Sequence, residues 1–298
     1  MIASRIRSAD TVSIIVPIAF MVGVLAGEPV QGLRIALVPL IALIGVALFG
    51  GRGARHAWGT NLIARRDGPP PQLWLTAHYD SKSQWMSMAL RLCGLVCFLL
   101  QLPALVALVA VWLGGERDQW IAALAVPALA GGALLARADL TNVSPGAVDN
   151  ASGLLAAFET LTRLPADLPV GLAFFDAEEW GLQGARALVR EQPALFAGSS
   201  VVNFDGIDDR GVTIVLGHRA GALAPRIAQA AGARRASWLP VLVDGMAIAR
   251  VTRECLTVMR GNWSTMRRVH TPRDAADRLT LDGVRAVATA VADAVRKA

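Results

Sequence analysis

Four long apolar runs without charged side chains dominate the first half of the chain. They are Thr11–Gly27, Ile35–Gly51, Leu92–Gly115 and Trp120–Ala136. A helix that crosses the hydrocarbon core of a membrane needs roughly 17–25 such residues. It also satisfies its own backbone hydrogen bonds, which lipid requires. The pattern therefore predicts four transmembrane helices in two hairpins.

Two other interpretations of these runs stay open. The first run also fits a cleaved signal peptide, with Arg5 and Arg7 as its basic region. A retained hairpin is favoured, because a second apolar run follows after a short loop and no small-residue cleavage motif ends the first. The segment from Leu92 to Ala136 also fits a hairpin that is buried in the protein or lies on the membrane surface.

The remaining residues alternate between strand and helix patterns. This alternation predicts an α/β fold, a three-layer α/β/α sandwich around a mixed sheet. The strand-like apolar runs are Gln72–Ala77, Val170–Phe175, Ser200–Phe204, Val212–Leu216 and Cys255–Met259, and the helical patterns are Ser152–Leu164, Gly184–Glu191, Ala220–Ala231 and Asp282–Ala294. We expect an N-terminal transmembrane hairpin (1–51), a first part of the α/β domain (52–90), an inserted transmembrane hairpin (91–137) and the main part of the α/β domain (138–298).

Composition and charge agree with a membrane protein. The chain is 54% hydrophobic and 17% charged, whereas soluble domains carry about 25% charged residues. The four runs predict a multi-pass cell-membrane protein. Arg and Lys gather at the N-terminus and between Arg52 and Arg91, so the positive-inside rule predicts that the α/β domain is cytoplasmic. The net charge of +6 comes mainly from scattered Arg without an RNA-binding motif, which argues against a nucleic-acid partner. Three cysteines provide no disulfide framework.

Acidic residues and histidines stand at the ends of the predicted strands or at the start of a helix. Because the ligand sites of open α/β sheets lie at the carboxyl ends of strands, we expect these side chains to converge. They are His78 and Asp80 after QLWLTA, Asp149 in PGAVDNASG, Glu178 and Glu179 after VGLAFFDA, Asp205 after SVVNF, and His270 in VHTPRDAADRL.

Each of these short motifs alone also fits a turn, a helix cap or a solvated surface. Their combination supplies imidazole and carboxylate groups, the ligands that zinc uses in hydrolytic centres. The adjacent pair Glu178 and Glu179 offers one carboxylate for a metal and another for the proton of a water.

The series AHYDS, PGAVDNASG, DAEEWGLQGA, NFDG and HTPRDAADRL resembles the M28 family of zinc aminopeptidases, in the family's order. The resemblance implies two zinc ions, with Asp149 bridging both. It implies His78 and Asp205 as further ligands of one zinc, and Glu179 and His270 as further ligands of the other. Glu178 resembles the general base, Asp80 the residue that orients His78, and Asp244 in VLVDGMAIARVTREC an aspartate near the substrate pocket.

The sequence departs from the family pattern at two places. Val269 precedes His270 where the family often has Tyr, and Tyr79 is the chain's one tyrosine, so the family's oxyanion-stabilising tyrosine is missing or replaced by another donor. The segment between Asp80 and Asp149, a short loop in the family, here contains two apolar runs. This insertion favours an active site near the bilayer and membrane-bound or amphipathic peptide substrates.

The resemblance thus predicts a membrane-bound metallo-aminopeptidase with a two-zinc centre. The alternatives are a glutaminyl-cyclase-like or carboxypeptidase activity on the same scaffold, and a non-catalytic membrane scaffold protein. Retention of every two-metal ligand argues against the cyclase, since the resembling cyclases use one zinc, and against the scaffold protein, which would tend to lose ligands.

Overall fold

A computed structural model describes residues 59–84, 86–99, 140–141 and 143–297 of the chain. These residues fall into two compact units. Residues 84, 86–99 and 140 belong to the α3 unit, and residues 59–83, 141 and 143–297 belong to the sheet unit. The α3 unit contains the helix α3 (Met88–Leu99). The sheet unit contains every residue for which the sequence predicts a chemical role.

A mixed seven-stranded sheet forms the centre of the sheet unit, and this confirms the predicted α/β class. The strand order is β1-β5-β2-β6-β9-β7-β8. Strands β5, β2, β6 and β9 run parallel, β1 and β7 are antiparallel to their inner neighbours, and β8 is parallel to β7. The bounds are β1 (Leu62–Arg65), β2 (Leu73–His78), β5 (Val170–Phe175), β6 (Ser200–Ile207), β7 (Val212–Arg219), β8 (Arg234–Ala236) and β9 (Glu254–Gly261).

The burial of each strand follows its apolar content. All six residues of β2 and all six of β5 are buried, as expected for inner parallel strands that helices cover on both faces. The edge strand β1 is exposed throughout. The sequence analysis did not predict β1 or β8, because their short, partly charged runs carry no alternation of apolar and polar positions.

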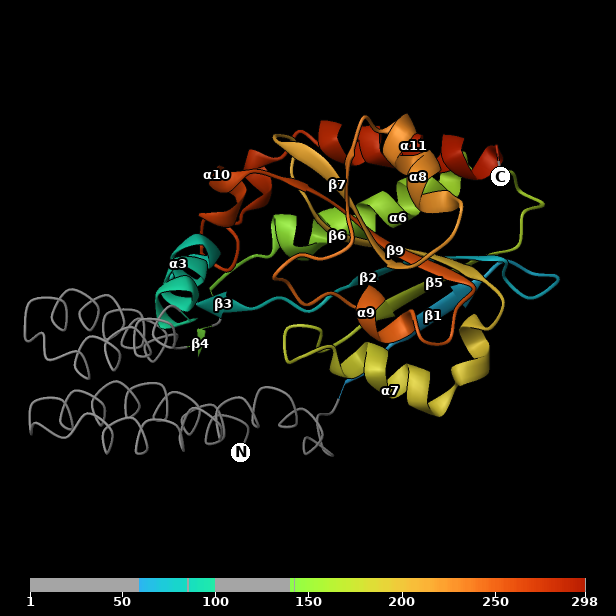
Figure 1. Ribbon diagram of the computed structural model, residues 1–298, viewed down its shortest axis with the longest axis horizontal. Coiled ribbons are helices and arrows are strands. Elements are labelled where there is room, and N and C mark those ends of the chain that lie inside the picture. Colours follow the sequence, from blue (N-terminus) through green and yellow to red (C-terminus); the bar gives the residue numbers. More distant parts are fainter. Residues whose placement is uncertain (1–58, 85, 100–139, 142, 298) are drawn as a thin grey trace, which may run out of the picture. The chain divides into compact units, whose positions relative to one another are not determined.

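Helices cover both faces of the sheet, as Figure 1 shows. One face packs against α6 (Ser152–Arg163), α8 (Leu223–Ala230) and α11 (Asp282–Arg296), and the other against α7 (Gln183–Glu191) and α9 (Gly245–Ile248). In α11 the buried Val284, Val287, Ala288 and Val291 recur at helical spacing and form the stripe that faces the sheet. The three predicted layers are therefore present in the sheet unit.

Short elements complete the described structure. They are β3 (Ser83–Gln84), β4 (Leu140–Thr141), α10 (Trp263–Met266) and the helical turns η2 (Ala147–Ala151), η3 (Pro193–Phe196) and η4 (Ala276–Arg278). Strands β3 and β4 pair in a separate two-stranded sheet. The backbone N–H of Val143 donates to Ser83 Oγ at 2.7 Å. The residues that precede and follow the inserted segment in the chain therefore lie together in the sheet unit.

The predicted transmembrane helices fall largely outside the described residues. Thr11–Gly27, Ile35–Gly51 and Trp120–Ala136 lie wholly outside them, and Leu92–Gly115 is described only as far as Leu99. Within the described part of the chain, no helix combines the length and the apolarity that a bilayer crossing needs. The membrane hairpins and the predicted boundaries at residues 51, 90 and 137 stay predictions.

Candidate two-metal site

Three neighbouring parallel strands bring the predicted residues to one edge of the sheet. His78 is the last residue of β2, Glu178 and Glu179 follow β5, and Asp205 lies in β6. The order β5-β2-β6 places these strands side by side, and parallel strands end at the same edge. Strand β6 continues past Phe204, where the sequence predicted its end, to Ile207 with an irregularity in its pairing to β9. Asp205 therefore lies within the strand and does not follow it.

Two loops bring the remaining ligand candidates to the same edge. Asp149 lies in the turn η2 just before α6, with backbone angles that are not helical. His270 follows α10 and has a left-handed φ of 66°, which is uncommon for residues other than glycine. Both residues therefore depend on tertiary contacts for their position.

The five ligand candidates form two groups that share Asp149. One group is His78, Asp149 and Asp205, and the other is Asp149, Glu179 and His270. Each residue offers one ligand atom, and within each group these atoms lie within 4.8 Å of one another. Carboxylate and imidazole are among the ligand types that zinc uses, so each group could hold a metal ion.

The two oxygens of Asp149 face different histidines. Asp149 Oδ1 lies 3.1 Å from His78 Nε2, and Asp149 Oδ2 lies 3.0 Å from His270 Nε2. Glu179 Oε1 lies 2.8 Å from the same His270 nitrogen. A carboxylate with one oxygen toward each half of the site has the arrangement that a bridging ligand requires. The donor set therefore fits two divalent ions.

The buried histidines and carboxylates of the site shift one another's pKa values. Burial lowers the pKa of His270, but hydrogen bonds to Asp149 and Glu179 outweigh it and raise the pKa to about 9. Burial also opposes the charge of Asp149, yet its pKa is lowered because both histidines donate to it. Burial, which outweighs the nearby His78, raises the pKa of Asp205 to about 7. Two metal cations would replace the protons of these groups, since metal binding and protonation compete for the same atoms.

Glu178 belongs to neither donor group formed by the described residues. It is 7% exposed, and burial raises its pKa well above the usual range, with further repulsion from Asp205 and Asp244. A buried carboxylate with a raised pKa, next to a metal site but outside its ligand set, is suited to accept and return a proton.

Asp80 contacts both His78 and the loop that carries Glu178 and Glu179. Its side-chain Oδ1 lies 3.4 Å from His78 Nδ1, and its carbonyl oxygen is nearer at 3.0 Å. The two carboxylate oxygens accept the backbone N–H groups of Glu178 at 3.0 Å and Glu179 at 3.2 Å. Asp80 thus links the end of β2 to the loop that holds both glutamates.

Asp244 is completely buried just before α9, and neither of its carboxylate oxygens has a hydrogen-bond partner among the described residues. Burial raises its pKa to about 8, with a further contribution from the charges of Asp205 and Asp80. A buried, unpartnered carboxylate is unfavourable. The raised pKa favours the neutral carboxyl group, and this lowers the cost of burial.

Two residues that the sequence analysis did not select contact this site. Lys82 Nζ lies 3.4 Å from Glu179 Oε2. Asp274 accepts the backbone N–H groups of Val148 and Asp149. In the sequence, only their positions near the predicted motifs point to these two residues. Lys82 follows the His-x-Asp motif, and Asp274 lies four residues after His270. Tyr79 donates its hydroxyl to the carbonyl of Thr60 at 2.5 Å, so its oxygen is engaged outside the donor groups.

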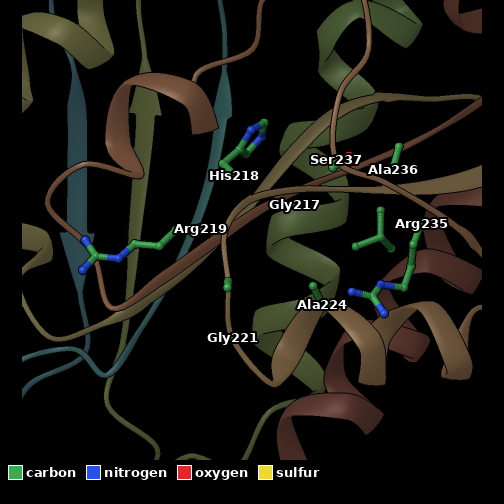
Figure 2. Close-up of a pocket in the computed structure, with 10 residues that line it drawn as sticks. Gly217, His218, Arg219, Gly221, Ala224, Arg235, Ala236 and Ser237 are labelled. Atoms are coloured by element: carbon green, nitrogen blue, oxygen red, sulfur yellow. The ribbon is translucent and has the colours of Figure 1, made fainter.

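A cavity of about 330 Å³ lies elsewhere in the sheet unit, at the end of β7 and against α8. Figure 2 shows its lining, which includes Gly217, Ala224 and Arg235 and none of the ligand candidates. His218 also lines the cavity, and burial lowers the pKa of this imidazole to about 4. The cavity is therefore separate from the candidate metal site.

Comparison with protein families gives one match. Residues 130–295 match peptidase family M28, a range that contains all ligand candidates except His78. The comparison with curated proteins found no match.

Comparison with solved structures gives distant similarities, and the three described here have TM-scores below 0.5. The aminopeptidase from Aneurinibacillus sp. strain AM-1 is 16% identical over 80% of this chain, with a TM-score of 0.48. A peptidase M28 precursor from Shewanella amazonensis SB2B is 16% identical over 78%, with a TM-score of 0.48, and LapA of Legionella pneumophila is 15% identical over 79%, with a TM-score of 0.46. The chain covers 47%, 43% and 56% of these proteins, about half of their length.

Proposed function

Since the chain belongs to peptidase family M28, we propose that it is a zinc-dependent peptidase, and more specifically an aminopeptidase with a two-zinc centre. The observation that carries this proposal is the position of Asp149, whose two oxygens face His78 and His270 at 3.1 and 3.0 Å. His78 and Asp205 would hold one zinc with Asp149, and Glu179 and His270 would hold the other. When bound, zinc supplies Lewis acidity toward water and toward a carbonyl oxygen.

Glu178 performs the proton transfers of the proposed reaction. Its carboxylate takes a proton from the attacking water and returns it to the amine nitrogen of the scissile bond as that bond breaks. Hydrogen bonds from the backbone of Glu178 and Glu179 to Asp80 hold the loop in place. The low exposure of Glu178 keeps bulk water away from the proton that it carries.

Asp244 is proposed to recognise the free N-terminus of the substrate. Its two oxygens are buried without a described partner, and its pKa is raised to about 8. An ammonium group next to it would favour the ionised carboxylate and pair with it. This supports cleavage at the N-terminal end of a peptide over a carboxypeptidase reaction, in which the recognised terminus would be an anion. The expected substrates are therefore peptides with an unblocked amine.

Metal analysis and a substrate panel test this proposal together. Protein purified without chelator should contain about two equivalents of zinc and should hydrolyse aminoacyl p-nitroanilides but not their N-acetylated counterparts. One equivalent with cyclisation of glutaminyl substrates would favour the cyclase-like alternative. Hydrolysis of N-blocked peptides from their carboxyl end would favour the carboxypeptidase. Absence of both metal and activity would favour the scaffold protein.

The N-terminal and inserted apolar runs are proposed to make this a multi-pass membrane protein with the sheet unit in the cytoplasm. The support is the apolar length of the runs and the concentration of Arg and Lys between Arg52 and Arg91. A cysteine in place of the exposed Arg186 on α7 tests the side, in a background without Cys93 and Cys97. A membrane-impermeant thiol reagent should label it only after lysis, and labelling of intact cells would overturn the cytoplasmic assignment.

A further inference from the structure

Asp274 connects the two segments that carry Asp149 and His270. Its Oδ1 accepts the backbone N–H of Val148 at 2.7 Å, and its Oδ2 accepts that of Asp149 at 3.1 Å. Its own carbonyl accepts the N–H of Ala147 at 3.1 Å. Asp274 is 1% exposed, so water does not compete for these hydrogen bonds. Three consecutive backbone donors before α6 are thus held by one residue of the His270 loop.

Asp80 makes the same kind of connection on the other side of the site. Both of its carboxylate oxygens accept consecutive backbone N–H groups, here from Glu178 and Glu179. Each histidine of the site is thus followed by an aspartate, two residues after His78 and four residues after His270. Each of these aspartates accepts two backbone hydrogen bonds from a segment that supplies a carboxylate, and we call this arrangement a clamp. Two separate clamps therefore hold four ligand-bearing segments together in pairs.

The clamp at Asp274 acts where the local backbone provides little support. His270 has a left-handed φ of 66°, and Asp149 has φ and ψ of −117° and 86° inside the turn η2. Neither conformation belongs to a helix or strand that would maintain it. The distance of 3.0 Å between Asp149 Oδ2 and His270 Nε2 thus depends on contacts between the two loops.

We propose that Asp274 is a positioning residue for the metal centre, an inference that rests on the proposed two-zinc function. By fixing the backbone of Asp149 to the His270 loop, it sets the separation between Asp149 and His270 before any metal binds. Partners behind the ligands of a metal typically change its affinity by about 10- to 100-fold. The effect should be largest for the metal held by Asp149, Glu179 and His270.

A matched control separates positioning from a general contribution to stability. Asp209 also accepts two backbone N–H groups with its carboxylate, from Thr280 at 2.5 Å and Gly283 at 3.0 Å. It belongs to neither donor group of the described residues. Asp209→Asn therefore weakens a similar clamp without contact to the ligands, whereas Asp274→Asn replaces one acceptor by an amide that cannot accept from an N–H.

The test compares the full chain with these two variants. Asp274→Asn should weaken the binding of one of two zinc ions by about 10- to 100-fold in a chelator competition. It should also change the exchange coupling between two Co²⁺ ions that Asp149 bridges. Before metal is added, the amide protons of Val148 and Asp149 should exchange faster with solvent. Asp209→Asn should leave all three measurements at the wild-type values, even if both variants lose similar stability.

Several outcomes decide between the possibilities. Equal metal affinity, equal Co²⁺ spectra and unchanged amide exchange in Asp274→Asn would overturn the positioning role. If Asp274→Asn does not fold, Asp274→Glu keeps both acceptor oxygens at a shifted position. This second variant should show the weakened metal binding in a folded protein, and wild-type metal affinity in it would overturn the proposal. A wild-type chain that binds fewer than two metals would instead refute the proposed function.

Discussion

Replacing Glu178 by glutamine tests whether this residue is the general base of the proposed site and not a metal ligand. The two side chains have nearly the same shape, but the amide cannot take up a proton from water. Glu178 lies outside both donor groups of the described residues, so the substitution leaves all five ligand candidates intact. A positioned general base contributes about 10²- to 10⁴-fold in rate, and this corresponds to about 2.7–5.4 kcal/mol of transition-state stabilisation.

The same substitution should not destabilise the metal-free protein. Burial raises the pKa of Glu178 well above its usual range, and Asp205, Asp244 and Glu179 repel its charge. A neutral side chain removes this repulsion. We therefore expect the melting temperature of metal-free Glu178→Gln to equal or exceed that of the wild type.

The assay measures kcat/KM on an aminoacyl p-nitroanilide together with zinc content. Glu178→Gln should lose activity and retain its zinc. The adjacent Glu179→Gln is the matched control, because it disturbs the 2.8 Å contact with His270 and should lose zinc as well. Wild-type activity in Glu178→Gln would refute its role as the base, and loss of zinc would show that it is a ligand.

Three further substitutions test other parts of the structure. His270→Ala removes a ligand from one donor group only, so elemental analysis should find about one remaining equivalent of zinc; two would contradict the assignment. A methyl group in Gly245→Ala would lie 2.5 Å from the ring of His218, and urea unfolding should show a loss of about 1–3 kcal/mol. Gly217→Ala, whose nearest contact is 4.0 Å away, is its control and should change little. Backbone hydrogen bonds from Gly283 and Thr280 outweigh burial and lower the pKa of Asp209, so the stability difference between wild type and Asp209→Asn should be present at pH 7. It should shrink as the pH falls below about 3.9, where the unfolded carboxylate gains its proton. A pH-independent difference would show that this charge is not stabilised in the folded chain.

The inner strands of the sheet could be predicted because their signal is local. The runs that form β2 and β5 are continuously apolar over six residues, and both strands are buried throughout. Polar residues at the ends of such runs then indicate a ligand site, since parallel strands end at one edge. In this way the sequence indicated His78, Glu178 and Glu179 as neighbours before any contact was known. The resemblance to a family added the role of each residue.

The edge strands and the clamps could not be predicted in this way. Strand β1 is exposed, and it is a strand because it pairs with β5, more than 100 residues away. Asp274 is separated by 125 residues from the backbone N–H of Asp149 that it accepts. Nothing in the residues around Asp274 distinguishes this aspartate from one that caps a turn.

The sequence by itself determined which side chains are candidates for the chemistry and near which local elements they lie. A strand or helix pattern depends on residues only a few positions apart, and donor chemistry depends on residue type alone. Only the tertiary structure decided which atoms meet. It placed one oxygen of Asp149 toward each histidine, left the carboxylate of Asp244 without a described partner, and brought Lys82 to Glu179. These relations depend on how distant segments pack in three dimensions, and local patterns along the chain do not contain that information.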